Sequence, residues 1–142
     1  MDEKYLVFNV REKQYALPSK LIREVAALEK IFPLPLAPDY VRGIINRYSV
    51  PYALIDIRFL LHNEISETGK VIVLKEEVDK LAFLIDDVSD IAEPEKLMKI
   101  EQEENAVAGP IGAYFELKGS QVFCIDTAEI INKIKQDFAR DE

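Results

Sequence analysis

The side chains that could carry chemistry in this sequence are few. His62 is the only imidazole and Cys124 the only thiol, so they are the only candidates for a histidine base and a cysteine nucleophile. His62 follows a segment predicted to be a short helix, where an imidazole interacts favourably with the helix dipole. Cys124 lies between two apolar residues of a predicted strand, where a buried thiol behaves as a small hydrophobic group. We therefore interpret both side chains as structural.

Four aspartates that follow apolar runs are the other candidates. They could act as acid and base or as metal ligands, and they are Asp56, Asp86, Asp87 and Asp126. Helix capping and turns account for them more simply, because aspartate is favoured at both places. No glycine-rich loop follows a predicted strand, and one histidine with one cysteine cannot form a tetrahedral metal site alone. We expect no catalytic activity, no cofactor and no metal. The rival hypothesis, a small-barrel enzyme or ligand binder, requires Asp56, Asp86 and Asp126 to converge in one cleft.

An excess of acidic residues limits the classes of partner. The 142 residues contain 18 Lys and Arg against 26 Asp and Glu, which gives a formal net charge of -8. The resulting field repels nucleic acid phosphates and anionic lipid. No apolar run approaches the roughly 18 residues that span a bilayer, and the N-terminus shows no signal-peptide pattern. We expect a cytoplasmic protein that binds no nucleic acid and does not insert directly into a membrane.

Two parts of the sequence share one layout, a hairpin that ends in Ile-Asp and is followed by a helix. Residues 43–56 form the first copy and residues 112–126 the second, so Asp56 corresponds to Asp126. The strand segment 15–18 corresponds in the same way to 81–84. The two segments are displaced along the chain by nearly the same amount as the two hairpins, which indicates a duplication.

Each copy contains about five short strands, too few to cover both faces of an open sheet. Closing the strands into a small barrel removes the exposed edges. The sequence therefore predicts a mainly β protein with two packed five-stranded barrels. A short helix at 57–61 is expected after the first barrel, and a C-terminal helix is expected after Asp126.

Several ordered motifs resemble a known family. They are Leu6-Val7-Phe8, Tyr15-Ala16-Leu17-Pro18, Ile22-Arg23-Glu24-Val25, the segment Pro35 to Asn46, Leu54-Ile55-Asp56-Ile57-Arg58 and the segment Leu84 to Ile91. No single motif is specific. Their order and spacing together, from about Tyr5 to Ile134, resemble the CheW adaptor family of bacterial chemotaxis.

The resemblance implies a single CheW-like domain over residues 1–142, built from two intertwined SH3-like barrels at roughly 5–61 and 70–134. It implies a non-enzymatic scaffold that couples the cytoplasmic tips of chemoreceptors, the methyl-accepting chemotaxis proteins, to the regulatory domain of the histidine kinase CheA. Such a scaffold is recruited to receptor arrays at the membrane. The alternative is the same kind of adaptor in another kinase pathway, such as pilus or gliding motility.

The resemblance also implies a receptor-binding groove between the barrels that accepts a helical hairpin tip. The matching positions are Ile22, Glu24, Gly43, Val71, Val88 and Ile91. Exposed β-branched side chains would supply apolar contact area, and the glycine would let a backbone approach closely. Each position also has a structural interpretation: the four aliphatic residues could be core, the glutamate a surface charge and the glycine part of a turn with positive φ.

The turn after Asn46 departs from the family pattern. The family has an arginine that can pair with the glutamate matching Glu24, but this chain has Tyr48 there, and Arg47 lies one position earlier. A shift by one residue points a strand side chain to the other face, so we expect Arg47 to reach Glu24 only if a bulge or a flexible turn redirects it. We assign Arg47 and Tyr48 to kinase binding or a turn contact. We predict that Tyr48 is exposed and contacts a partner; a ring folded onto its own barrel is the alternative.

Overall fold

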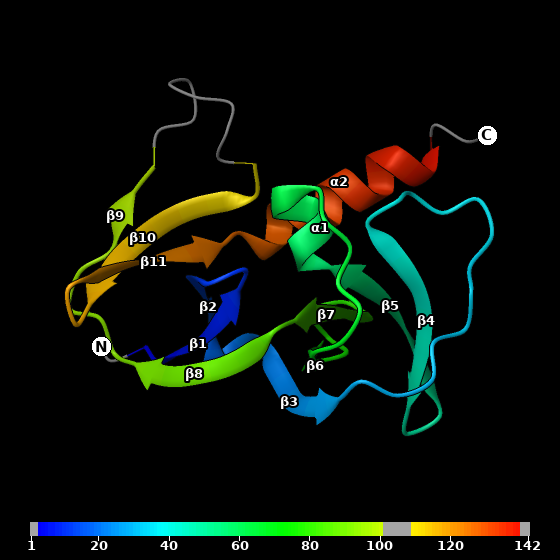
Figure 1. The fold of residues 1–142 in the computed structure, drawn as a ribbon, viewed down its shortest axis with the longest axis horizontal. Helices are drawn as coiled ribbons and strands as arrows, with labels where there is room; N and C mark the ends of the chain where they lie inside the picture. Colours follow the sequence, from blue (N-terminus) through cyan, green and yellow to red (C-terminus); the bar gives the residue numbers. More distant parts are fainter. Residues whose placement is uncertain (1–2, 101–108, 140–142) are drawn as a thin grey trace. The chain divides into compact units, whose positions relative to one another are not determined.

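The computed structural model describes residues 3–100 and 109–139 and shows a mainly β protein (Figure 1). The chain forms two compact units. Unit 1 comprises Met1–Lys20 and Ser89–Glu142, and unit 2 comprises Leu21–Val88. Each unit is built on one sheet and carries one α-helix, so the predicted fold class is confirmed. No helix among the described residues is both long and apolar enough to span a membrane.

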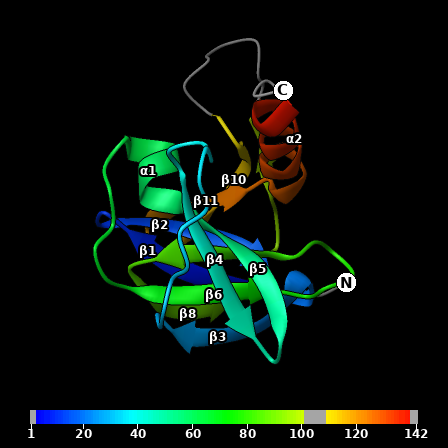
Figure 2. The same cartoon turned by 90° about the vertical axis from the view of Figure 1, so that its right-hand side faces the viewer.

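Unit 2 contains a five-stranded sheet in the order β3-β6-β7-β5-β4. Its elements are β3 (Ile22–Ala27), β4 (Val41–Arg47), β5 (Val50–Asp56), α1 (Ile57–His62), β6 (Lys70–Leu74) and β7 (Leu81–Ile85). Figure 2 shows the β4–β5 hairpin, with α1 following β5 at the end opposite the hairpin turn. The central strands β6 and β7 are almost continuously buried, because they lie inside the sheet and are covered on both faces.

Unit 1 contains a six-stranded sheet in the order β8-β1-β2-β11-β10-β9. Its elements are β1 (Tyr5–Val10), β2 (Lys13–Pro18), β8 (Asp87–Ala92), β9 (Met98–Lys99), β10 (Ile111–Leu117), β11 (Ser120–Ile125) and α2 (Thr127–Ala139). The first two residues of β8 fall within the bounds of unit 2. A 3-10 turn, η1 (Ser19–Leu21), leads into β3. The sixth strand was not predicted, because β9 is only two residues long.

The two sheets repeat one pattern of strand pairing. In unit 2, β6 is antiparallel to β7, β7 parallel to β5, and β5 antiparallel to β4. In unit 1, β1 is antiparallel to β2, β2 parallel to β11, and β11 antiparallel to β10. The register also repeats: Ala82 opposes Leu54 in unit 2, and Ala16 opposes Cys124 in unit 1. The partners in these two pairs are equivalent positions of the duplication that the sequence indicates.

The sheets nevertheless divide the chain differently from the expected ranges 5–61 and 70–134. The opening hairpin β1–β2 pairs with β11, far along the chain, and β6–β7 pairs with β5. Each sheet thus combines the opening hairpin of one repeat with the later strands of the other. The parallel pairs β2–β11 and β5–β7 form this exchange, and each joins two strands that a long segment of chain separates.

Each unit has its own apolar core. The core cluster of unit 1 contains Tyr5, Val7, Ala16, Ala92, Phe115, Val122 and Cys124. The core cluster of unit 2 contains Ile45, Tyr52, Leu54, Val71, Val73, Ala82 and Leu84. Burial raises the pKa of the Cys124 thiol to about 11, so the thiol is protonated at neutral pH and acts as a core group.

Candidate partner-binding surface

The strand residues predicted to form one apolar surface do not share one environment. Val71 is only 1% exposed and packs in the core of unit 2, because β6 is a central strand. The expectation that Val71 offers exposed contact area is therefore wrong. Ile22 and Val88 are half-buried, whereas Ile91 is 62% exposed. Ile91 belongs to unit 1, whereas Ile22 and Val71 belong to unit 2.

Val88 and Ile91 lie on opposite faces of β8. Exposure alternates along this strand, with Asp87, Ser89 and Ile91 exposed and with Val88, Asp90 and Ala92 half-buried or buried. Side chains that are three positions apart in a strand point to opposite faces. Only Ile91 of this pair therefore presents a large apolar side chain at the surface.

Gly43 is required by the chain's own backbone. Phe32 and Ile44 exchange two backbone hydrogen bonds of 2.8 Å, which bring the connector after β3 against β4. A Cβ atom on Gly43 would lie 2.4 Å from the Phe32 carbonyl oxygen, and the glycine has a φ of +143°. Both observations support the structural interpretation of Gly43.

Arg47 pairs with Glu24 in spite of its displacement by one position. The guanidinium donates two hydrogen bonds to the carboxylate, Nε to Oε2 at 3.0 Å and Nη2 to Oε1 at 3.2 Å. Arg47 opposes Val50, and it follows the buried Ile45 by two positions, so both side chains point to the same face of β4. The register irregularity of the β4–β5 pair lies between residues 41 and 43 and not at the turn. Arg47 thus pairs with Glu24 from one position earlier in the chain than the arginine of the family pattern, and the contact is bidentate.

Tyr48 extends this pair outward from the hairpin turn. Tyr48 and Ser49 have φ values of 54° and 65°, the geometry of a tight two-residue hairpin turn. The Tyr48 hydroxyl donates to Glu24 Oε1 at 3.3 Å, and its ring lies 4.4 Å from the Arg23 guanidinium carbon. The residue is still 64% exposed, so its predicted exposure is confirmed. The ring rests on its own barrel at one side and leaves most of its surface accessible.

We call Arg23, Glu24, Arg47 and Tyr48 the β3–β4 clasp, because their side chains join the two edge strands of the unit 2 sheet. The hydrogen bonds from Arg47 hold the pKa of Glu24 below its ordinary value of 4.5. The same contact raises the pKa of Arg47, which also lies 3.6 Å from the Glu29 carboxylate. Both charges of the pair thus persist at neutral pH.

Arg23 is the member of the clasp that sequence reasoning missed. Its guanidinium stacks on Tyr48 and donates to the Tyr52 hydroxyl at 3.4 Å. The signal in the sequence was an arginine at an outward position of a strand next to Glu24, but its aromatic partner lies in a hairpin turn much further along the chain. The stacking could be found only once β3 and the hairpin turn were placed together.

The aspartates have structural partners. Asp56 is fully buried, caps α1 through Phe59 N at 3.2 Å and accepts from Arg42 Nη1 at 3.1 Å. Asp126 caps α2 in the same way, through Glu129 N at 3.2 Å. Asp86 lies 3.8 Å from the Arg58 guanidinium, and Asp87 lies 3.4 Å from the Lys70 ammonium. The described residues contain no group of three or more His, Cys, Asp or Glu side chains arranged to hold a metal ion.

Comparison with known proteins places this arrangement in a family. The family model for the CheW-like domain matches residues 4–135. The chain belongs to the CheW-like domain family. This CheW-like chain is similar to the chemotaxis protein CheW of Bacillus subtilis, with 26% identity over 92 residues that cover 63% of the chain and 59% of the relative. It is also similar to the chemotaxis protein CheW of Treponema pallidum, with 28% identity over 99 residues, 63% of the chain and 58% of the relative.

A solved structure of the same kind has a similar fold. The scaffolding protein TtCheW from Thermoanaerobacter tengcongensis superposes with a TM-score of 0.77 at 18% sequence identity. The superposition covers 88% of this CheW-like chain and 84% of that chain. The matches to the curated relatives, in contrast, span less than two thirds of the length of those proteins.

Proposed function

We propose that this CheW-like chain is a non-enzymatic adaptor that couples the cytoplasmic tips of chemoreceptors to the regulatory domain of the histidine kinase CheA. The family match over residues 4–135 carries this proposal. The structure supports it with an exposed, pre-ordered surface on an edge of the unit 2 sheet. In this role the adaptor works in the cytoplasm and is recruited to receptor arrays at the membrane.

The β3 edge supplies the contact surface on unit 2. Val25 is 39% exposed on the outer face of β3, Ile22 is half-buried at the start of the strand, and the exposed Tyr48 ring lies against Arg23 of the same strand. Aromatic and arginine side chains are enriched where binding energy is concentrated. The clasp holds Tyr48 through its hydroxyl and through the Arg23 guanidinium, so part of its rotamer freedom is lost before a partner arrives. In this proposal, Ile22, Glu24, Arg47 and Tyr48 together form the contact surface on unit 2.

Ile91 supplies the corresponding apolar contact on unit 1. Its side chain stands on the exposed face of β8, where an amphipathic receptor helix would find apolar area. Val71 and Gly43 act from beneath the surface in this proposal, since both are buried. Val88 occupies the inner face of the same strand as Ile91 and serves as support.

Binding to the two partners separately tests the proposal. We expect Ile91→Asp to lose capture of a receptor cytoplasmic hairpin fragment, because a charge would enter an apolar contact. Ile65→Asp is the matched control, since Ile65 is 60% exposed and lies outside the proposed surface. Equal capture by the two folded variants would remove Ile91 from the receptor contact.

The kinase arm uses the clasp. We expect Tyr48→Ala to weaken binding to the isolated CheA regulatory domain about 30-fold, the effect of truncating an aromatic residue that contributes roughly 2 kcal/mol at an interface. Leu36→Ala is the control, because Leu36 is 87% exposed and lies outside the clasp. Isothermal titration calorimetry measures both affinities. An unchanged affinity for the tyrosine variant would contradict its assignment, and no detectable binding of either partner to the unaltered chain would overturn the proposed function.

A further inference from the structure

The two sheets place equivalent residues at one edge of each unit. Phe32 opposes Ile44 in unit 2, and Met98 opposes Tyr114 in unit 1. These two pairs occupy equivalent positions of the duplication, so the edge beside β4 in unit 2 corresponds to the edge beside β10 in unit 1.

The side chains that lie between β3 and β4 in unit 2 differ from those between β8 and β10 in unit 1. Glu24 on β3 corresponds to Asp90 on β8, and both are half-buried. Arg47 at the end of β4 corresponds to Leu117 at the end of β10. The position that closes unit 2 with an arginine therefore holds a leucine in unit 1.

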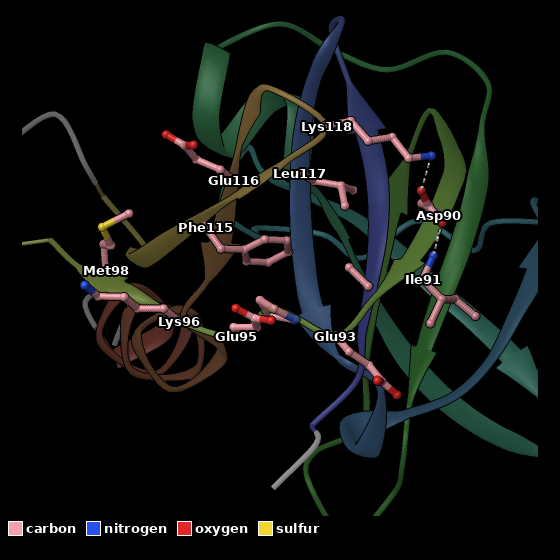
Figure 3. Close-up of a pocket in the computed structure, with 12 residues that line it drawn as sticks. Asp90, Ile91, Glu93, Glu95, Lys96, Met98, Phe115, Glu116, Leu117 and Lys118 are labelled. Carbon is pink, nitrogen blue, oxygen red and sulfur yellow. Dashed lines mark hydrogen bonds and ion pairs between the residues drawn. The ribbon is translucent and has the colours of Figure 1, made fainter.

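A groove lies at this place in unit 1. Its volume is about 630 Å³, and it is lined by the end of β8, the segment that follows it, Met98 of β9 and the end of β10 (Figure 3). The equivalent residues in unit 2 line a cavity of about 80 Å³, with Arg47 among them. The same architectural site is thus nearly closed in one unit and open in the other.

The floor of the groove is apolar. Phe115 and Ala92, which are 1% and 6% exposed, belong to the core of unit 1, and the side chains of Leu117 and Met98 are only partly covered (Figure 3). Ile91 is also among the lining residues and is mostly exposed. A visiting aliphatic chain would therefore cover apolar area that water now contacts.

The rim lacks an arginine, and its four carboxylates, on Asp90, Glu93, Glu95 and Glu116, outnumber its two lysines, Lys96 and Lys118. Asp90 and Glu95 occupy the positions of Glu24 and Glu29, the two carboxylates that Arg47 contacts in unit 2. Asp90 has one cation near it, the Lys118 ammonium at 3.5 Å, and the Lys118 side chain is 81% exposed (Figure 3). A solvated pair of this kind contributes little to stability. Glu95 has no ion pair among residues 3–100 and 109–139 that the structure shows.

We propose that the unit 1 groove binds an arginine side chain presented by a partner protein. An arginine has an aliphatic stem for the apolar floor and a planar guanidinium for the acidic rim. Unit 2 holds such a side chain at the equivalent site, where Arg47 makes a bidentate contact with Glu24 and also reaches Glu29. The inference needs neither a receptor nor a kinase, so it stands or falls independently of the proposed adaptor function.

The probe is a blocked peptide, Ac-Ala-Leu-Arg-Leu-Ala-NH2, compared with the same peptide carrying citrulline, a neutral isostere, in place of arginine. Titration of the isotope-labelled full chain is followed by the backbone amide signals of Ile91, Met98 and Leu117. We expect saturable shifts at these amides, with an affinity at least tenfold higher for the arginine peptide than for the citrulline peptide. Equal affinity of the two peptides, or no shift at these amides, would overturn the proposal.

Variants at the groove separate its filling from its charge. Leu117→Arg would place an arginine side chain of the chain itself in the groove, so we expect it to abolish peptide binding. Leu117→Met is the matched control and should bind the peptide as the unaltered chain does. Equal binding by the two folded variants would count against the proposal.

The paired substitution Asp90→Asn with Glu95→Gln keeps the shape of the rim and removes its charge. We expect it to lower the affinity for the arginine peptide at least tenfold and to leave the affinity for the citrulline peptide unchanged. This arm remains decisive if Leu117→Arg does not fold. Retention of the full preference for arginine in the neutral-rim variant would refute the recognition of a guanidinium by these carboxylates.

Discussion

Replacing Arg42 by methionine should destabilise the protein by about 3 kcal/mol, because it leaves the buried carboxylate of Asp56 without its cation. Asp56 is fully buried and accepts from Arg42 Nη1 at 3.1 Å, from Ser66 N at 2.9 Å and from Ser66 Oγ at 3.0 Å. Arg42 also donates to the Ser66 carbonyl oxygen. Removing one partner of a buried ion pair typically costs about 3–5 kcal/mol. We take the lower limit because three neutral hydrogen bonds to Asp56, including the Phe59 cap, remain.

Urea denaturation followed by circular dichroism measures this loss. A total stability of about 5–15 kcal/mol is usual, so the variant should still fold at room temperature. For a chain of this length a loss of about 3 kcal/mol lowers Tm by roughly 6–12 °C. The matched control is Arg58→Met, since Arg58 is 33% exposed and pairs with a partly exposed Glu64 at 3.3 Å. We expect that control to change stability by less than about 1 kcal/mol.

A double substitution checks the cause. If the unpaired charge is responsible, Arg42→Met combined with Asp56→Asn should recover part of the stability lost by the arginine variant alone. A loss below about 1 kcal/mol for Arg42→Met, or a further loss in the double variant, would refute the stabilising role of this buried pair between β4 and the end of β5.

The remaining predictions concern the backbone, the clasp and the thiol. Gly43→Ala should lower the free energy of unfolding by about 1–3 kcal/mol, and by more than Gly119→Ala does. A Cβ atom on Gly43 would lie 2.4 Å from the Phe32 carbonyl oxygen, whereas a Cβ atom on Gly119 would meet nothing within 4 Å. Thermal unfolding of the two variants measures the difference. Glu24 has a lowered pKa, so its contribution to the free energy of unfolding is fully present above its ordinary pKa of 4.5 and is lost as the pH falls through the lower folded pKa. Arg47→Met should reduce this loss of stability at acid pH, as measured by urea unfolding at a series of pH values. An unchanged pH dependence would contradict the pairing. Cys124, with a pKa of about 11, should be about 0.1% thiolate at pH 8 and react with a thiol reagent only on unfolding, so rapid labelling of the native protein would disprove its burial.

The local structure could be predicted from the sequence because it depends on residues that are close together in the chain. Asp56 caps α1 as expected, and the segments 15–18 and 81–84 of the duplication lie in the strands β2 and β7. The correspondence between the two copies is reproduced in the pairing register, where Ala16 and Ala82 oppose equivalent residues. Each of these features depends on neighbouring residues or on a repeat that is visible in one chain.

The rest could not be predicted, because it depends on which distant strands become neighbours. The exchange of the opening hairpins is made by the parallel pairs β2–β11 and β5–β7, for which the sequence has no local signal, and only the family resemblance implied intertwined barrels. Val71 looked suitable for an exposed contact but lies in a central strand, and only the strand order reveals this. Arg47 was expected to reach Glu24 only through a bulge or a flexible turn, whereas it lies on the same face of β4 as the buried Ile45 and reaches Glu24 with no register irregularity at the turn.

The exchanged hairpins set an order of events during synthesis. Unit 2 is contiguous from Leu21 to Val88, so all of its strands are available well before the last strand of unit 1 has been made. The hairpin β1–β2 must wait for β11, the last strand among the residues that the structure describes, before its parallel neighbour exists. Closing so long a loop is slow compared with local pairing, and domains generally fold as their residues emerge. The growing chain therefore exposes the edge of β2 that pairs with β11 until β11 has been made, and an unpaired strand edge is a site for association with other chains.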